Sequence, residues 1–274
     1  MAPRAGWRDR LEPDTYYRDH WLDVAPERVE AYEEMFRWRP ELEPLLEPAG
    51  IVEGQTVVDY GCGPGMLSLE LAQRVGETGR VHAVDINDLF LQRAAGHAEA
   101  DRLRDRIEFH RIEADRLPLA GGTVDRVVCK NVLEYVDDPL QTLRDFRRVL
   151  RPGGRVHAID SDWGMLAVEP IGPERLARVF EAARIAYRTP LIGRKLFGFM
   201  REAGFHEVRV KVLAGADTSG RAAAVLFHMA RYARESGRLP AAELDGFERD
   251  LRAAIETGTY LLVLPQFLVT AVAP

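Results

Sequence analysis

The chain alternates between short apolar runs and longer amphipathic stretches over most of its length. The short runs are rich in β-branched residues, whereas the longer stretches repeat apolar positions at the helical period. Such alternation is typical of a parallel sheet with helices on both faces. The pattern predicts strands at 56–60, 80–86, 107–112, 126–129 and 155–160, and helices at 66–75, 87–103, 139–150, 173–187 and 194–203.

Both ends of the chain depart from this alternation. Residues 1–50 are rich in charged and aromatic side chains and contain a helical stretch at 26–37, so we expect an N-terminal helical and aromatic cap segment. Residues 51–274 are expected to form the main domain. Within it, 207–213 and 266–272 have the pattern of strands, and the largely helical residues between them predict a helical cap insertion at about 215–258.

A glycine-rich turn, Val-Val-Asp-Tyr-Gly-Cys-Gly-Pro-Gly at 57–65, joins the first strand to the helix that follows it. Glycine permits positive φ and a close approach of a ligand to the backbone, and this turn of an α/β sheet opens the crevice that binds nucleosides. The third glycine comes one residue earlier than in a dinucleotide fingerprint, and Pro64 removes a backbone donor. Both departures argue against a nicotinamide cofactor, and no Gly-Lys-Ser/Thr follows, which excludes a P-loop.

Five segments, in order, resemble the motifs of the S-adenosylmethionine-dependent methyltransferases of the seven-stranded Rossmann-like type. The resemblance is strongest to the small-molecule branch that includes the ubiquinone and menaquinone methyltransferases, and covers about 50–212 and again 264–269. It implies a doubly wound, mostly parallel seven-stranded sheet with an antiparallel last strand and a helical cap, S-adenosylmethionine as cofactor, and methyl transfer as activity. The segments are 57–65, 81–85, 113–119, 125–136 and 149–154.

The expected cofactor-binding residues follow the strands. Asp85 ends the second strand, 20 residues after Gly65, where a carboxylate can accept hydrogen bonds from both ribose hydroxyls. The resemblance implies that Asp115 takes the adenine amino group, and Asp59 is expected to bond the turn or meet the cofactor's ammonium group. The complete predicted set is Tyr17, Asp59, Gly61, Cys62, Gly63, Asp85, Ile86, Asp115, Arg116, Lys130 and Asn131.

Methyl transfer by in-line displacement mainly requires that the nucleophile, the methyl carbon and the sulfur be held collinear and that water be excluded. A general base is therefore not required for every acceptor. Candidate proton acceptors are His20, Asp160 and Asp162. We expect no metal, and we expect Cys62 and Cys129 to be reduced, buried thiols rather than nucleophiles.

The distribution of aromatic residues bears on the acceptor. Trp7, Trp21 and Trp38 are three of the four tryptophans and fall in the first 38 residues. They either attach this segment to the domain or form a lid that lines an acceptor pocket. Tyr16, Trp163, Tyr187 and Phe197 are candidates for the same pocket or for ordinary core packing. If the pocket exists, the acceptor is small and hydrophobic or aromatic, such as a quinone-like or secondary-metabolite intermediate.

Composition and charge exclude some classes of binding partner. The formal net charge of −6 argues against a protein that holds a nucleic acid by neutralising phosphates. The longest apolar run, at 260–273, is shorter than a bilayer span requires, so we expect a cytoplasmic protein without a membrane span; the oligomeric state stays open, with a homodimer as one option. Two alternatives remain: a non-methylating, cyclase-like enzyme that binds S-adenosylmethionine, and a protein or RNA methyltransferase.

Overall fold

The computed structural model describes residues 15–22, 24–113 and 116–274 of the chain. Seven strands form one sheet in the order β3-β2-β1-β4-β5-β10-β7. Strands β1 to β5 pair in parallel, and β10 runs antiparallel to both of its neighbours, which confirms the predicted fold class. The strands are β1 (Thr56–Tyr60), β2 (Arg80–Asp85), β3 (Ile107–Arg111), β4 (Val124–Lys130), β5 (Leu150–Ser161), β7 (His206–Leu213) and β10 (Gln266–Val272).

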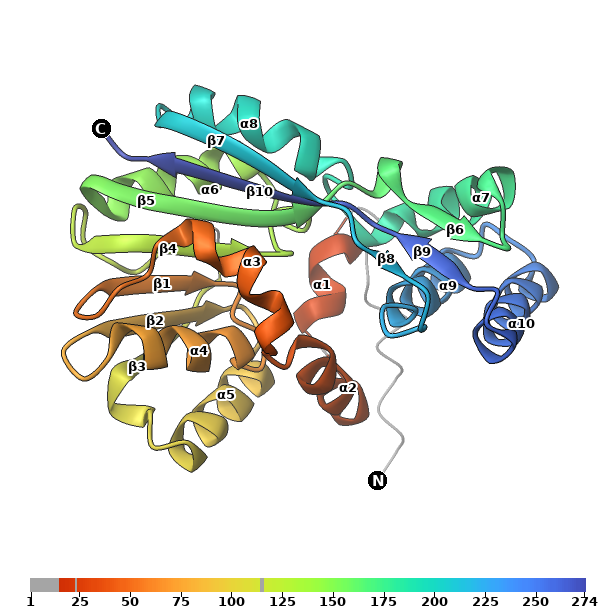
Figure 1. The fold of residues 1–274 in the computed structure, drawn as a ribbon, viewed down its shortest axis with the longest axis horizontal. Helices are drawn as coiled ribbons and strands as arrows, with labels where there is room; N and C mark the ends of the chain where they lie inside the picture. The colour runs from red at the N-terminus through yellow and green to blue at the C-terminus, as the bar shows by residue number, and fades with distance from the viewer. Residues whose placement is uncertain (1–14, 23, 114–115) are drawn as a thin grey trace.

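Helices cover both faces of this sheet (Figure 1). On one face, α4 (Met66–Val75) and α5 (Asp88–Ala100) pack on side chains such as Val57 and Val81. On the other, α6 (Pro139–Val149) and α8 (Ile192–Glu202) pack on Val58 and Val84. Alternate residues of each central strand thus enter opposite cores, which explains why these strands are continuously apolar.

A smaller, largely helical cap lies beyond the carboxyl ends of the parallel strands (Figure 1). It contains α7 (Pro173–Ala183), α9 (Ala224–Ser236), α10 (Ala241–Thr257) and a three-stranded antiparallel sheet. Its core is separate from those of the large sheet and includes Val179, Leu226 and Phe247. Besides the expected insertion, the cap therefore recruits α7 and the small sheet, whose strands are β6 (Ala167–Glu169), β8 (Ala216–Asp217) and β9 (Leu261–Val263).

The N-terminal helices connect the two parts. Figure 1 shows α1 (Tyr16–Leu22) between the sheet and the cap, with α2 (Pro26–Phe36) beside it. Short helical turns then lead to β1, and their residue Leu46 enters the core under α4. The remaining elements are α3 (Glu43–Leu46) and the 3-10 turns Pro40–Leu42, Glu47–Ala49, Arg104–Arg106, Trp163–Met165 and Arg184–Ala186.

No helix in the part of the chain that the structure describes has the length and apolar character needed to span a bilayer. Trp7, one of the predicted aromatic cap residues, lies outside the described residues.

Candidate cofactor and substrate site

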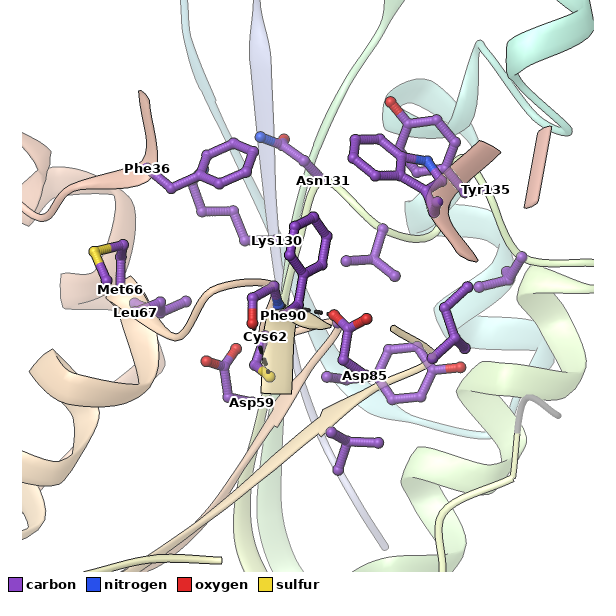
Figure 2. Close-up of a pocket in the computed structure, with 18 of the residues that line it drawn as sticks. Phe36, Asp59, Cys62, Met66, Leu67, Asp85, Phe90, Lys130, Asn131 and Tyr135 are labelled. Atoms are coloured by element: carbon purple, nitrogen blue, oxygen red, sulfur yellow. Dashed lines mark hydrogen bonds between the residues drawn. The ribbon is translucent and has the colours of Figure 1, made fainter. Parts of the chain in front are cut away.

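A cavity of about 360 Å³ opens at the carboxyl ends of β1, β2 and β4 (Figure 2). Its volume is near the lower end of the roughly 300–1,000 Å³ typical of small-molecule sites. The strand order reverses between β1 and β4, and open α/β sheets bind ligands at such a switch point. The cavity therefore lies where the sequence predicted a nucleoside crevice.

The glycine-rich turn forms one wall of the cavity, and its glycines serve different purposes. Gly61, Gly63 and Gly65 all have positive φ. A Cβ at Gly61 would lie 2.3 Å from Val132 Cγ2, and one at Gly65 would lie 2.6 Å from Ala94 Cβ, so these two glycines allow close packing. A Cβ at Gly63 would meet no heavy atom within 4 Å. Gly63 instead leaves backbone open beside the cavity.

Asp85, at the end of β2, faces the cavity and ties its walls together. One carboxylate oxygen accepts the Gly63 N–H at 2.8 Å, and the other accepts the Asn87 N–H at 2.9 Å. Each oxygen keeps a further lone pair, so the carboxylate can also accept from two hydroxyl groups. Burial raises the pKa of Asp85 to about 6, although the backbone hydrogen bonds oppose this shift.

Asp59, at the end of β1, is a second buried carboxylate at the cavity wall. The Ser68 hydroxyl donates a hydrogen bond to it at 2.5 Å. Burial raises the pKa of Asp59 to about 7, and the nearby charge of Asp85 adds to the effect. Two carboxylates in one partly apolar cavity favour a ligand that carries positive charge or several hydrogen-bond donors.

Polar atoms without partners also border the cavity. Asn131 has a positive φ of 55° and follows Lys130 at the end of β4. Its Oδ1 atom and the Nε1 atom of Trp21 are buried and form no hydrogen bond with the described residues. Because an unsatisfied buried polar atom is costly, these two atoms suit a ligand that supplies a donor and an acceptor.

The structure brings most of the predicted cofactor residues to this cavity: Asp59, Gly61, Cys62, Gly63, Asp85, Ile86, Lys130 and Asn131. Tyr17 is buried but does not belong to the lining, and its hydroxyl donates to Asp137, which does line the cavity. Arg116 is exposed and does not belong to the lining. Asp115 lies outside the described residues.

The three candidate proton acceptors are held in other contacts, and the lining includes none of them as far as the described residues go. His20 Nδ1 donates to the Tyr16 carbonyl at 2.6 Å, and burial lowers the pKa of His20 to about 3. Asp160 accepts the Leu133 N–H at 3.0 Å, and Asp162 binds the guanidinium of Arg194. These contacts hold the three side chains in positions outside the described lining.

The expected pocket residues lie outside this cavity lining as well. Tyr16, Trp163 and Tyr187 are buried in the cap core, where the rings of Tyr16 and Tyr187 pack with that of Tyr232 and the ring of Trp163 packs with that of Tyr187. Phe197 lies on α8 and is 44% exposed. None of the four belongs to the cavity lining defined by the described residues. Apolar residues at helical spacing also suit a core, and Tyr16, Trp163 and Tyr187 are buried in one.

Apolar side chains form a second wall of the cavity, which we call the apolar wall. Many of them come from elements in which the sequence contains no chemical motif. Of the N-terminal tryptophans, Trp21 and Trp38 line the cavity. Further apolar lining residues come from α2, from the turns before β1 and from the first turns of α4 and α5: Met35, Phe36, Leu42, Leu45, Met66, Leu67 and Phe90. For Met66 and Leu67 in α4, the position next to the glycine-rich turn could have predicted a place in the cavity lining.

The chain matches a known family in the region that builds this site. Residues 57–154 match the family described as methyltransferase domain. The ubiquinone/menaquinone biosynthesis C-methyltransferase of Klebsiella pneumoniae is 35% identical over 115 residues, which are 42% of this chain and 46% of that protein. The chain thus spans about half the length of the curated relatives it matches.

Solved structures share the fold over a longer stretch. Phosphoethanolamine N-methyltransferase 2 of Haemonchus contortus, in complex with phosphomonomethylethanolamine and S-adenosylhomocysteine, aligns with a TM-score of 0.64 at 16% identity, covering 97% of this chain and 61% of that one. The cyclase SpnF aligns with a TM-score of 0.57 at 19% identity, covering 85% and 80%. Residues 57–154 therefore match a methyltransferase domain, and the chain is similar to the ubiquinone/menaquinone C-methyltransferases over 115 residues.

Proposed function

We propose that the protein transfers the methyl group of S-adenosylmethionine to a small, hydrophobic or aromatic acceptor by in-line displacement. The observation that carries this proposal is the two-sided lining of the cavity. Buried carboxylates, Asp59 and Asp85, lie at the glycine-rich turn, and an apolar wall lies next to them. Such a cavity can hold a cationic nucleoside beside an apolar molecule and keep water from both.

In this proposal, acidic and amide side chains of the cavity bind the different parts of the cofactor. S-adenosylmethionine would supply a methyl group on a positively charged sulfonium, which is a good leaving group. Asp85 is suited to hold the two ribose hydroxyls, because both of its oxygens are fixed by backbone donors and retain acceptor capacity. Asp59 and Asn131 Oδ1 would face the cationic part, and Asp115 remains proposed for the adenine by resemblance alone.

The apolar wall indicates the chemistry of the acceptor. Figure 2 shows Phe36, Met66 and Leu67 on one side of Cys62 and Lys130, and Asp85 and Tyr135 on the other. Lys130 Nζ lies 5.6 Å from the centroid of the Phe36 ring, where it can interact with the face of an aromatic ring or with an acceptor oxygen. A quinone-like acceptor suits this mixture, and the relative from Klebsiella acts in ubiquinone and menaquinone biosynthesis.

A second candidate function is supported by the likeness to the cyclase SpnF. A protein of this kind would bind the cofactor in the same cavity and shape a reaction of the second ligand without methylating it. Asp85 and the glycine-rich turn would then have the same roles, so the lining does not separate the two functions.

The release of S-adenosylhomocysteine distinguishes methyl transfer from the cyclase-like function. The purified protein is incubated with methyl-labelled S-adenosylmethionine and reduced quinones or phenols of increasing size, and both the label in the acceptor and S-adenosylhomocysteine are measured. We expect the two to form in equal amounts. Conversion of an acceptor without loss of the label from the cofactor would favour the cyclase-like function, and failure of the protein to bind the cofactor at all would contradict both.

A further inference from the structure

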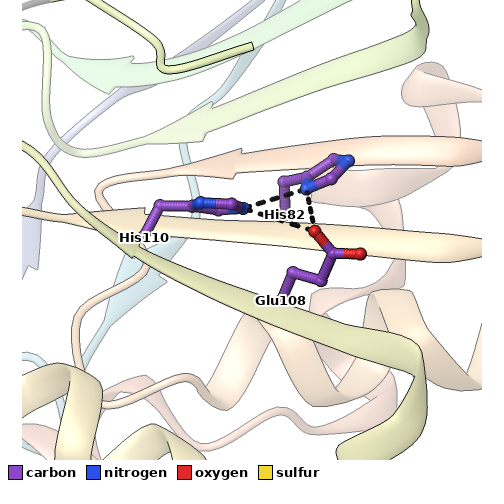
Figure 3. Close-up of side chains that lie close together, drawn as sticks. All are labelled: His82, Glu108 and His110. Carbon is purple, nitrogen blue, oxygen red and sulfur yellow. Dashed lines mark hydrogen bonds and ion pairs between the residues drawn. The ribbon is translucent and has the colours of Figure 1, made fainter.

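Three side chains with metal-binding groups converge on the outer part of the large sheet, away from the cavity (Figure 3). His82 lies on β2 and pairs in register with Glu108 on the neighbouring strand β3. His110 follows Glu108 by two residues, and alternate residues of a strand point to the same face. The parallel pairing of β2 and β3 therefore places all three side chains on one face of the sheet.

Part of this face is open to solvent at β2 and β3. The neighbouring residues Val81 and Ile107 point to the opposite face, where they enter the core formed with α4 and α5. On the face of His82, the covering helices α6 and α8 pack farther along the sheet, and the described residues between β3 and β4 contain no helix. The side chains of His82, His110 and Glu108 are 14%, 23% and 57% exposed, so solvent reaches them from one side.

The distances between the three donor atoms form a triangle of suitable size for a metal ion. His82 Nδ1 lies 3.0 Å from His110 Nε2, and Glu108 Oε2 lies 3.4 Å from the first and 3.8 Å from the second. A point equidistant from the corners of this triangle is about 2.0 Å from each. Zinc binds imidazole nitrogen at about 2.0–2.1 Å and carboxylate oxygen at about 2.0–2.2 Å.

We propose that His82, Glu108 and His110 bind one divalent transition-metal ion, zinc in the first place, with water in the remaining position. Two imidazoles and one carboxylate are a common ligand set for zinc, and a fourth position open to solvent is compatible with their exposure. Two nitrogen ligands disfavour magnesium and calcium, which prefer oxygen. The ion would join the edge strand β3 to β2.

The protonation of the imidazoles agrees with this site. Burial lowers the pKa of both His82 and His110, and the charge of Glu108 opposes the shift only in part. The neutral imidazole, which is the form that binds metals, is therefore favoured at neutral pH. The competing interpretation is a metal-free cluster, in which one imidazole donates a hydrogen bond to the other and Glu108 accepts a second hydrogen bond.

A competition titration distinguishes the metal site from the hydrogen-bonded cluster. The full chain, without a polyhistidine tag and stripped with a chelator, is titrated with Zn²⁺ in the presence of a chromophoric chelator. We expect one ion per chain. We expect H82Q and H110Q to weaken binding more than about 100-fold, beyond the roughly 10–100-fold loss that follows removal of an outer partner. Mg²⁺ in millimolar excess should not displace the zinc.

The matched control is H206Q, because His206 is an exposed histidine on β7 at the opposite edge of the sheet. It should bind zinc as the unaltered protein does. E108Q keeps the size of a largely exposed side chain, so it tests the carboxylate even if a histidine variant unfolds. The absence of stoichiometric zinc binding, or binding that E108Q and the H82Q/H110Q double variant both retain, would overturn the proposal.

Discussion

Asp85 is the residue on which the proposed cofactor site depends most. Its carboxylate joins the glycine-rich turn to the start of α5 through the N–H groups of Gly63 and Asn87. The sequence identified this residue because an acidic side chain at the end of the second strand is a general feature of nucleoside sites in this type of sheet. Its two backbone contacts were not predictable, since they depend on how the turn folds back toward β2.

Replacement of Asp85 by alanine tests the ribose contact. We expect D85A to weaken the binding of S-adenosylhomocysteine by about 1–3 kcal/mol, because hydroxyl groups of a buried ligand would lose their acceptor. Isothermal titration calorimetry measures the difference. D88A is the matched control, since Asp88 is an exposed carboxylate in the first turn of α5. Equal affinities of D85A and D88A would show that the ribose binds elsewhere.

The raised pKa of Asp59 predicts a dependence of stability on pH. Burial raises this pKa from 3.8 to about 7, so the folded state binds the proton more tightly than the unfolded state does. The stabilising effect is complete below the unfolded pKa and is lost as the pH rises through the folded pKa. Between pH 5 and 7, D59N should therefore gain stability relative to the unaltered protein, by at most about 1.4 kcal/mol per pH unit.

Urea unfolding of the ligand-free protein and of D59N at several pH values measures this difference. D125N is the control, because Asp125 lies on β4 outside the cavity lining. The same ionisation predicts that S-adenosylmethionine binds more tightly as the pH rises from 5 to 8, since a positively charged ligand favours the ionised carboxylates. An affinity that falls over this range would contradict a role of Asp59 in binding the cation.

At the scale of elements, most of the large sheet follows from local patterns. Strands β1 and β10 and helix α4 have the bounds that the sequence predicted. β5 begins at Leu150 rather than at residue 155, because pairing with its neighbours extends a segment that contains Pro152 and two glycines. The strands of the small sheet have only two or three residues, too few to show a period in the sequence, so local patterns do not predict them.

In the candidate site, too, some residues are placed by local sequence patterns and others by tertiary packing. Residues at the ends of strands, such as Asp59, Asp85 and Lys130, are placed by topology, so their positions could be inferred from the sequence. The apolar wall depends on how α2 and the following turns pack over the glycine-rich turn. That packing is tertiary, and the spacing of Met35, Phe36 and Leu45 in the sequence does not reveal it.

The glycine-rich turn gives a prediction for a pair of variants. G61A should destabilise the fold, because its Cβ would overlap with Val132. G63A has open space for its Cβ, so we expect only the roughly 1–2 kcal/mol cost of a left-handed conformation. Yet the added methyl group would fill space beside the cavity that Gly63 leaves open. We therefore expect it to abolish binding of S-adenosylhomocysteine. Thermal unfolding and calorimetry of both variants measure the two effects; full affinity in a folded G63A would contradict contact of a ligand with this turn.

For the whole molecule, the two parts have separate cores and meet at the N-terminal helices. Asn87 Nδ2 donates to the Trp21 carbonyl at 2.6 Å, and the Tyr17 hydroxyl donates to Asp137, so α1 is bonded to the loops that follow β2 and β4. Tyr16, in the same helix, is buried in the cap core. Helix α1 thus connects the cap to the cavity wall.

This arrangement predicts where a bound ligand should slow amide hydrogen exchange. S-adenosylhomocysteine should protect α1, α2 and the glycine-rich turn, because Trp21, Phe36 and Gly63 line the cavity. Helix α10 is an internal control, since its buried face packs within the cap core. Exchange monitored by mass spectrometry measures the difference. Protection confined to the large sheet would show that the N-terminal helices do not close over the ligand.

We propose that a nucleoside cofactor binds where β1, β2 and β4 end, with its sugar held by Asp85. A crystal structure of the protein with S-adenosylhomocysteine tests this most directly. We predict both ribose hydroxyls within hydrogen-bonding distance of the Asp85 carboxylate and the sulfur facing the apolar wall formed by Phe36 and Met66. Electron density for the ligand at another place, or a ribose turned away from Asp85, would show that the cofactor does not bind in this way.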